Sequence, residues 1–236
     1  MKTISQITFA IALMIHPVLG NPVIPLRALA LAKGIEIPDR YIQTSDGHVP
    51  LPISWLEPGA VMPAVADLGE LSIFEQITNE RNVIAYRVAE KVKLPTGAKG
   101  ILLLGWMAGD SPRYLAIDDD YLSAKHNDWM LINAADKAVA FQMGRNEKPV
   151  LIQPASVKKN RLNAKKNVGV SVIGQAQWDG KAKTFYSTYW PVRGGERGIV
   201  IFFSHHDRIS LRKITDPLAP ADPKTSVQGT SRIGNR

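Results

Sequence analysis

The stretch "IVIFFSHHDRISLRKI", Ile199 to Ile214, places a polar segment, Ser204 to Asp207, between two apolar patterns. The first pattern is a continuous apolar run, which is typical of a buried strand. In the second, Ile209 and Leu211 alternate with polar and basic residues, as in a strand with one buried face. The polar segment has the length and composition of a hairpin connection. The stretch therefore predicts an antiparallel hairpin within a β-rich fold.

The same hairpin carries a candidate metal site at His205, His206 and Asp207. Adjacent strand residues point to opposite faces, so both histidines would bind one ion only if the turn redirected one of them. Metal-binding histidines usually share the ion with ligands from a second segment, and "DDDYLSAKHND", residues 118–128, is the candidate for it. Asp118 and Asp120 in that segment could bind calcium. The other interpretation, which we favour, is that these residues form an ordinary turn. A solvated turn is the favoured interpretation of the histidine segment.

Further strand-like segments follow one another from Ser72 onwards. "NVIAYRVAEKVKLP" alternates with period 2, and "KGILLLGWMAG" is a continuous apolar run between glycines. Because no segment of helical period separates them, the sequence predicts an antiparallel, immunoglobulin-like β-sandwich over residues 72–215 and argues against an alternating α/β fold. The proline-rich residues 21–71 predict an extended lead-in with a short helix at Leu26–Lys33. Residues 216–236 predict a disordered tail, and no repeat of fixed period is visible.

The first twenty residues, "MKTISQITFAIALMIHPVLG", predict a signal peptide spanning residues 1–20. Lys2 is followed by an apolar segment, a break at Pro17 and a small residue, Gly20, at the expected cleavage point. The apolar run is shorter than the roughly 20 residues that a membrane-spanning helix needs, and the rest of the sequence offers no second candidate. We therefore expect export to the periplasm or the extracellular space, with no transmembrane segment after cleavage. The chain contains no cysteine, so the fold must be held by its core without disulfides.

The formal net charge is +8. Outside the cytoplasm, such a charge is usually solubilising or points to acidic envelope polymers, and nucleic acid is the weaker inference. The densest basic segment, "VKKNRLNAKKN", lacks the interleaved aromatic residues on which single-stranded nucleic acid would stack, so we expect no nucleic-acid partner. Binding of an acidic polysaccharide or an envelope protein is one interpretation, and a solubilising hairpin is the other. The candidate binding residues of this segment are Lys158, Lys159, Arg161, Lys165 and Lys166.

The segment "TFYSTYWPV" supplies the aromatic candidates for ligand binding. A strand there would place Tyr186 and Trp190 on one face and Phe185 and Tyr189 on the other. One of these faces belongs to the core, and the other is free to contact a ligand. The sequence does not distinguish the two, and Trp129 raises the same question.

Several segments in their order along the chain carry a resemblance to known modules: "WMLINAA", "AVAFQMG", "PVLIQP", "VGVSVIG", "YSTYWP", "RGIVIFF" and "ISLRKITD". From about Asp110 to Asp216 the pattern resembles small sandwich modules of unknown function in exported bacterial proteins. In those modules a bend follows the first strand, and Asn133-Ala134-Ala135 stands where that bend would be. The resemblance implies an immunoglobulin-like or transthyretin-like sandwich and transfers no active site.

The standard catalytic and cofactor motifs are missing from the sequence, and a cysteine nucleophile is excluded. A carboxylate pair drawn from Glu70, Glu75 and Glu90 would require the fold to bring them together. We therefore expect a non-enzymatic exported protein of the bacterial envelope, without a cofactor, in a binding or structural accessory role. The alternatives are a carbohydrate-binding or acidic-polymer-binding protein and a metal-dependent hydrolase built on the histidine hairpin.

Overall fold

The computed structural model describes residues 22–34, 36–79, 82–162, 168–206 and 208–219. In these residues every regular element is a strand, apart from one 3-10 turn, η1 (Tyr121–Ser123), which confirms the all-β prediction. None of their helical segments has the length and apolarity to cross a membrane. The predicted signal peptide and residues 220–236 of the predicted tail lie outside the described residues.

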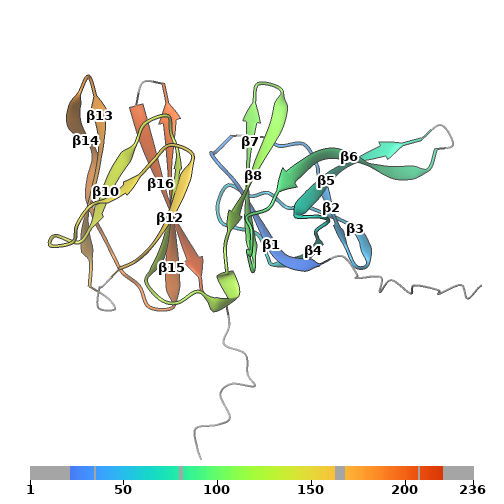
Figure 1. The fold of residues 1–236 in the computed structure, drawn as a ribbon, viewed down its shortest axis with the longest axis horizontal. Helices are drawn as coiled ribbons and strands as arrows, with labels where there is room; N and C mark the ends of the chain where they lie inside the picture. Colours follow the sequence, from blue (N-terminus) through green and yellow to red (C-terminus); the bar gives the residue numbers. More distant parts are fainter. Residues whose placement is uncertain (1–21, 35, 80–81, 163–167, 207, 220–236) are drawn as a thin grey trace, which may run out of the picture.

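The described strands form four sheets of four strands, which we name A to D (Figure 1). Sheets A and C are mixed, because β1 runs parallel to β7 and β9 runs parallel to β15, whereas B and D are antiparallel. Sheet A is β4 (Met62–Val65), β1 (Val23–Ala30), β7 (Ile101–Ala108) and β8 (Ser111–Asp118); sheet B is β3 (Gly47–Pro50), β2 (Tyr41–Thr44), β5 (Glu70–Thr78) and β6 (Ile84–Lys93). Sheet C is β12 (Ser156–Arg161), β9 (Asp128–Ala134), β15 (Glu196–His205) and β16 (Arg208–Pro217); sheet D is β11 (Val150–Ile152), β10 (Val139–Met143), β13 (Val170–Trp178) and β14 (Lys181–Trp190).

The four sheets lie side by side as two sheet pairs, A with B and C with D (Figure 1). The first core, between A and B, contains Leu26, Leu103 and Ile73. The second core, between C and D, contains Trp129, Phe141 and Phe202. Two cores thus replace the single sandwich predicted over residues 72–215, and the chain passes from one sheet pair to the other between β8 and β9.

The segment predicted as an extended lead-in supplies strands β1 to β4 of the first sheet pair, and Leu26–Lys33 is not a helix. Strand β1 lies between β4 and β7, with Ala28 facing the first core and Leu29 the opposite face of sheet A. A strand buried on both faces is apolar on both, so its sequence is not distinguished from a buried helix by periodicity. The position of β1 in the middle of a mixed sheet explains why the prediction was wrong.

The second sheet pair repeats the topology of the first. Strands β9 to β16 occupy the places of β1 to β8 in order, including the parallel central pair and the sheet edges. Hairpins β7–β8 and β15–β16 both have two-residue connections, closed by the pairs Ala108–Ser111 and His205–Arg208. Gly109 and His206 open these turns, both with positive φ. This repeat was not predicted from the sequence. Two units of the same topology need similar burial patterns and turns, but they do not need the same residues.

A third apolar layer joins the two sheet pairs, and we call it the seam. It packs the outer face of sheet A, through Leu29, Leu102 and Leu104, with the outer face of sheet C, through Ile199 and Ile201. All five side chains are buried. The central strands of both sheets therefore have no solvent face, which is the physical reason for the continuous apolar runs "ILLLG" and "IVIFF".

Candidate functional site

Two arginines and two aspartates form a buried charge network at one end of the seam. Arg27 comes from β1, Arg197 and Asp216 from β15 and β16, and Asp119 directly follows β8. Arg27 donates to both carboxylate oxygens of Asp216 at 2.9 and 2.8 Å, and Arg197 donates to both oxygens of Asp119 at 2.6 and 2.8 Å. Crossed bonds join the pairs, from Arg27 to Asp119 at 3.0 Å and from Arg197 Nε to Asp216 at 2.7 Å. The network therefore links both sheet pairs with no net charge.

The two aspartates of this network occupy equivalent positions in the repeat. Asp119 lies eight residues after Ser111, and Asp216 lies eight residues after Arg208. The repeated topology thus delivers one carboxylate from each sheet pair to the same junction. Each carboxylate accepts hydrogen bonds from both arginines, so each needs the opposite sheet pair for its full set of partners.

Tyr121 of η1 closes the network on one side. Its ring lies 3.7 Å from the Arg27 guanidinium carbon and 5.1 Å from that of Arg197, within range of cation–π attraction. Its hydroxyl donates to the Pro217 carbonyl at 3.0 Å. Burial alone would raise the pKa of Asp119, but its hydrogen bonds and ion pairs with Arg197 and Arg27 outweigh this and lower the pKa. Asp119 is accordingly held as the carboxylate.

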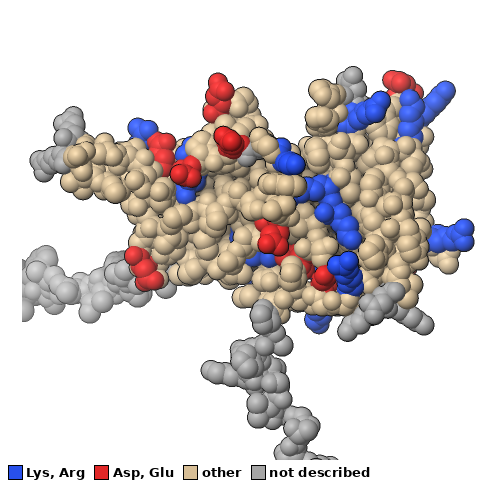
Figure 2. Space-filling view, turned by 180° about the vertical axis from the view of Figure 1, so that it is seen from behind, with Lys and Arg blue, Asp and Glu red and all other residues tan. Residues whose placement is uncertain are grey.

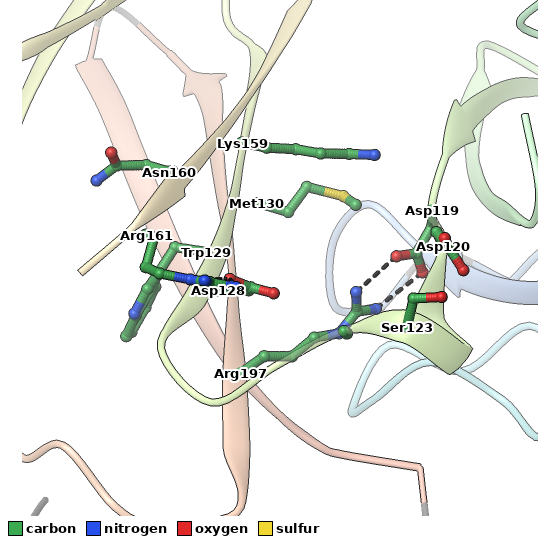
Figure 3. A pocket seen from close by; sticks show the side chains of 11 residues that line it. Asp119, Asp120, Ser123, Asp128, Trp129, Met130, Lys159, Asn160, Arg161 and Arg197 are labelled. Carbon is green, nitrogen blue, oxygen red and sulfur yellow. Dashed lines mark hydrogen bonds and ion pairs between the residues drawn. The ribbon is translucent and has the colours of Figure 1, made fainter. Parts of the chain in front are cut away.

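A pocket of about 440 Å³ opens beside the network, at the junction of the two sheet pairs (Figure 3). We call it the junction pocket. Lys159 of β12 spans it and pairs with Asp118 at 2.6 Å, and Arg161 pairs with Asp128 at 2.7 Å on the wall formed by sheet C. The residues that line it are Asp119, Asp120, Ser123, Ala124, Asp128, Trp129, Met130, Lys159, Asn160, Arg161 and Arg197.

Most of the charged side chains that line the junction pocket are paired with groups of opposite charge. Asp119 and Asp128 are both held by arginines, and an ionised carboxylate bound by a guanidinium is a poor general acid. Asp120 carries no ion pair to any described residue, and Ser123 lies beside it (Figure 3). A partner with backbone amides or a cationic group would find acceptors here.

The structure separates the two halves of the predicted metal site. His205 and His206 lie at the turn that ends β15, exposed, with ring centroids 4.4 Å apart. His126, from the proposed second segment, contacts the Glu196 carbonyl at 3.3 Å, at the other end of the same strand. The length of β15 places the two segments roughly 30 Å apart, so residues 118–128 do not complete a site at the hairpin.

Asp207 of the predicted site lies outside the described residues. Within the described ranges, no group of three or more His, Asp or Glu side chains is arranged to hold a metal ion. A calcium site at Asp118 and Asp120 stays a prediction. His206 has a φ of 51°, as the first residue of a two-residue hairpin turn requires. The hairpin interpretation of Ser204–Asp207 accounts for that backbone geometry.

The basic and aromatic candidates are on different sheets. Lys158, Lys159 and Arg161 lie on β12 of sheet C, whereas Tyr186 and Trp190 lie on β14 of sheet D. Lys165 and Lys166 lie outside the described residues. Of the three described cations, Lys159 and Arg161 are engaged in the ion pairs of the junction pocket.

The aromatic candidates of β14 lie against the second core. Trp190 is buried, stacks on Trp129 at 5.4 Å and donates from Nε1 to the Tyr186 hydroxyl at 2.9 Å. A bulge at Phe185 allows both Phe185 and Tyr186 to pack on this core, and leaves Tyr189 as the exposed aromatic of the strand. Binding by Tyr186 and Trp190 stays a prediction, with little of the Trp190 surface free to serve it.

Three members of the network, Arg27, Arg197 and Asp216, were not among the residues predicted to form a site. A signal was present, because a charged residue inside an apolar run such as "VIPLRALALA" requires a buried partner. The sequence did not indicate which residue that partner is, since Arg27 and Asp216 are 189 residues apart.

Comparison with known proteins identifies no family model and no curated sequence that matches this chain.

Proposed function

We propose that this protein is a non-enzymatic binding accessory of the bacterial envelope, exported by residues 1–20 and built from two immunoglobulin-like sandwiches. In this proposal the junction pocket holds an extended segment of another envelope protein. The observation that carries it is the pocket itself, which is walled by ion pairs that fix both sheet pairs in one arrangement beside the edge strand β12.

The charge network supports binding in preference to catalysis. Of the three acidic side chains that line the pocket, Asp119 and Asp128 are already paired with arginines, and Lys159 of the lining is paired with Asp118. A wall whose carboxylates are mostly paired presents shape and hydrogen-bonding groups, and those paired carboxylates are poor acids and bases. Fixing the pocket before the partner arrives also lowers the entropic cost of association.

Strand β12 supports an extended polypeptide as the partner. Among the described strands it pairs with β9 alone, so its other edge has backbone donors and acceptors that no described strand uses. An extended segment can add to such an edge through main-chain hydrogen bonds, while pockets for its side chains supply the specificity. The junction pocket is lined by Lys159, Asn160 and Arg161 of this strand, so it could accept a side chain of the added segment.

A site-specific photo-crosslinking experiment in cells tests the proposal. A benzophenone amino acid replaces Ser123, which lines the junction pocket, or, as a control, Thr188, which is exposed on sheet D. We expect one discrete protein adduct from position 123 and none from position 188. Failure to obtain an adduct at position 123, or the same adducts at both positions, would contradict the proposal.

Binding of an acidic polymer is the second candidate, because basic side chains predominate over the second sheet pair (Figure 2). Lys158 on β12 is exposed and forms no ion pair with any described residue. Retention on an acidic-polysaccharide resin that falls with added salt and with Lys158→Ala would support this function. Retention independent of both changes would speak against it.

A further inference from the structure

A second pocket of about 440 Å³ lies in the first sheet pair, away from the junction, and its lining is rich in hydrogen-bond donors. We call it the arginine pocket. It opens where β6 bulges, because Ile73 pairs with Glu90 and Phe74 with Val88, which leaves Ala89 without a partner. Its lining consists of Arg40, Glu75, Arg87, Val88, Ala89, Glu90, Ser111, Pro112, Arg113 and Tyr114.

Comparison of the two sheet pairs shows how the bulge of β6 differs from the corresponding bulge of β14. The bulge recurs in β14, where Gly174 pairs with Tyr186 and Gln175 with Thr184, so that Phe185 is the extra residue. The Phe185 ring packs against the second core and lies 6.3 Å from Phe202. In the first sheet pair the extra residue is only an alanine, and the same bulge opens onto a polar pocket. Bulges commonly re-aim side chains beside functional sites.

A second substitution within the repeat adds to this difference. Counted from the hairpin turns, Gly105 of β7 stands where β15 has Phe202, and Tyr114 stands where β16 has Leu211. A Cβ at Gly105 would lie 2.9 Å from the end of the Ile37 side chain, which would have to shift, and in tight contact with the Tyr114 ring at 3.4 Å. The glycine therefore makes room for a tyrosine whose hydroxyl reaches the pocket wall.

Two buried donors at this pocket lack acceptors. Tyr114 is 93% buried and its hydroxyl interacts with the Arg40 side chain, but neither that hydroxyl nor Arg40 Nε has a hydrogen-bond acceptor among the described residues. Burial raises the pKa of Tyr114, an effect that Arg40 opposes and Glu90 reinforces, so the hydroxyl keeps its proton at neutral pH. Leaving buried donors unpaired is costly, which indicates that a bound group or water supplies the acceptors.

The charges of the lining limit what that group can be. Arg40, Arg87 and Arg113 oppose Glu75 and Glu90, an excess of one positive charge. Arg87 is occupied, since it donates twice to Glu75. Arg113 and the part of the Arg40 guanidinium that does not donate to the Asp39 carbonyl therefore remain for a ligand, with Glu90 close enough to repel a group of higher negative charge. A monovalent carboxylate matches this balance, and guanidinium groups bind carboxylates well.

We propose that the arginine pocket binds a sugar acid, with its carboxylate on Arg40, Arg113 and the Tyr114 hydroxyl. The volume exceeds what a carboxylate alone requires and accommodates a sugar ring. Glu90 and the Ser111 hydroxyl provide hydrogen-bonding groups for ring hydroxyls, and Pro112 provides an apolar contact. This site is independent of the junction pocket and does not require the protein partner proposed there.

Isothermal titration calorimetry of the purified protein with galacturonate tests this site, with galactose and inorganic phosphate as comparison ligands. We expect galacturonate to bind, galactose not to bind and phosphate to bind more weakly. Arg113→Ala should weaken galacturonate binding by at least about tenfold, because it removes a charge-assisted hydrogen bond. Tyr114→Phe should weaken it by about threefold or more. Arg145→Ala removes an exposed arginine from the second sheet pair and should have no effect.

The repeat supplies a blocking variant. Ala89→Phe installs the residue that the second sheet pair carries at the same bulge, so it should abolish binding while the circular dichroism spectrum and the melting temperature remain near those of the wild type. Tri-galacturonate distinguishes the source of the sugar acid: tighter binding than the monomer indicates a polysaccharide, and equal binding indicates the free acid.

Three results would overturn the proposal. One is the absence of galacturonate binding to the wild type. Another is binding that survives both Arg113→Ala and a folded Ala89→Phe protein. The third is phosphate binding as tight as that of galacturonate, which would show that the pocket does not select a carboxylate.

Discussion

Replacement of Asp119 by asparagine is the most direct test of the buried network. The substitution keeps the size of the side chain and removes one negative charge, so Arg27, Arg197 and Asp216 remain with a net charge of +1 in a buried site. Three charge-assisted hydrogen bonds are weakened or lost, at 2.6, 2.8 and 3.0 Å. Breaking a buried ion pair by removing one partner costs about 3 to 5 kcal/mol of the free energy of unfolding.

For a chain of this length, that cost corresponds to a fall in melting temperature of roughly 6 to 20 °C. Differential scanning calorimetry, with urea denaturation followed by tryptophan fluorescence, measures the change. Asp120→Asn is the matched control, because Asp120 is the next residue and makes no ion pair to any described residue. Its effect should stay within about 0.5 kcal/mol.

A compensating variant separates loss of charge balance from simple loss of contact. Asp119→Asn combined with Arg197→Met leaves Arg27 and Asp216 as a neutral pair that keeps both of its direct hydrogen bonds. We expect the double variant to recover at least about half of the lost stability. A cost below about 1 kcal/mol for Asp119→Asn, or a double variant as unstable as the sum of its single variants, would refute the argument.

Four further predictions follow from the same structure. The wild type should exceed Asp119→Asn in free energy of unfolding by the full amount above the ordinary carboxylate pKa of about 4. Because the pKa of Asp119 is lowered in the folded state, this difference should shrink as the pH falls below that value. Urea midpoints measured across this pH range test the prediction. Ile201→Ala should cost about 2 to 5 kcal/mol by opening a cavity in the seam, as measured by urea denaturation. Gly198→Ala should lower the melting temperature or the soluble yield, because the new Cβ would lie 2.2 Å from the Trp129 ring. His206→Gly, which copies Gly109 of the repeat, should leave stability unchanged or raise it by up to about 1 kcal/mol, since glycine adopts positive φ without strain.

Part of the candidate sites lay within reach of the sequence. Arg27 interrupts an apolar run, and a buried charge requires an oppositely charged partner. The partner itself comes from β16, at the far end of the chain, and no spacing rule connects the two. The arginine pocket was hidden for a related reason: Arg40, Arg113 and Tyr114 come from separate segments and meet only when sheets A and B face each other. Glu75 and Glu90, considered as a carboxylate pair, both line that pocket, where Glu75 is held by Arg87.

The sequence by itself determined the local structure of this protein. Alternating and continuous apolar runs predicted strands, and the polar segment Ser204–Asp207 predicted a hairpin turn, because these features depend on side-chain periodicity and local backbone preference. It could not separate β1 from a buried helix, since a strand covered on both faces has no polar period.

Only the tertiary structure decided that there are two sheet pairs, that the second repeats the first, and that their outer faces meet at the seam. It also decided which charges are neutralised and which donors are left facing a pocket. The physical reason is that burial of an outer sheet face and pairing of a buried charge depend on contacts between residues far apart in the chain. Local propensity carries no information about those contacts.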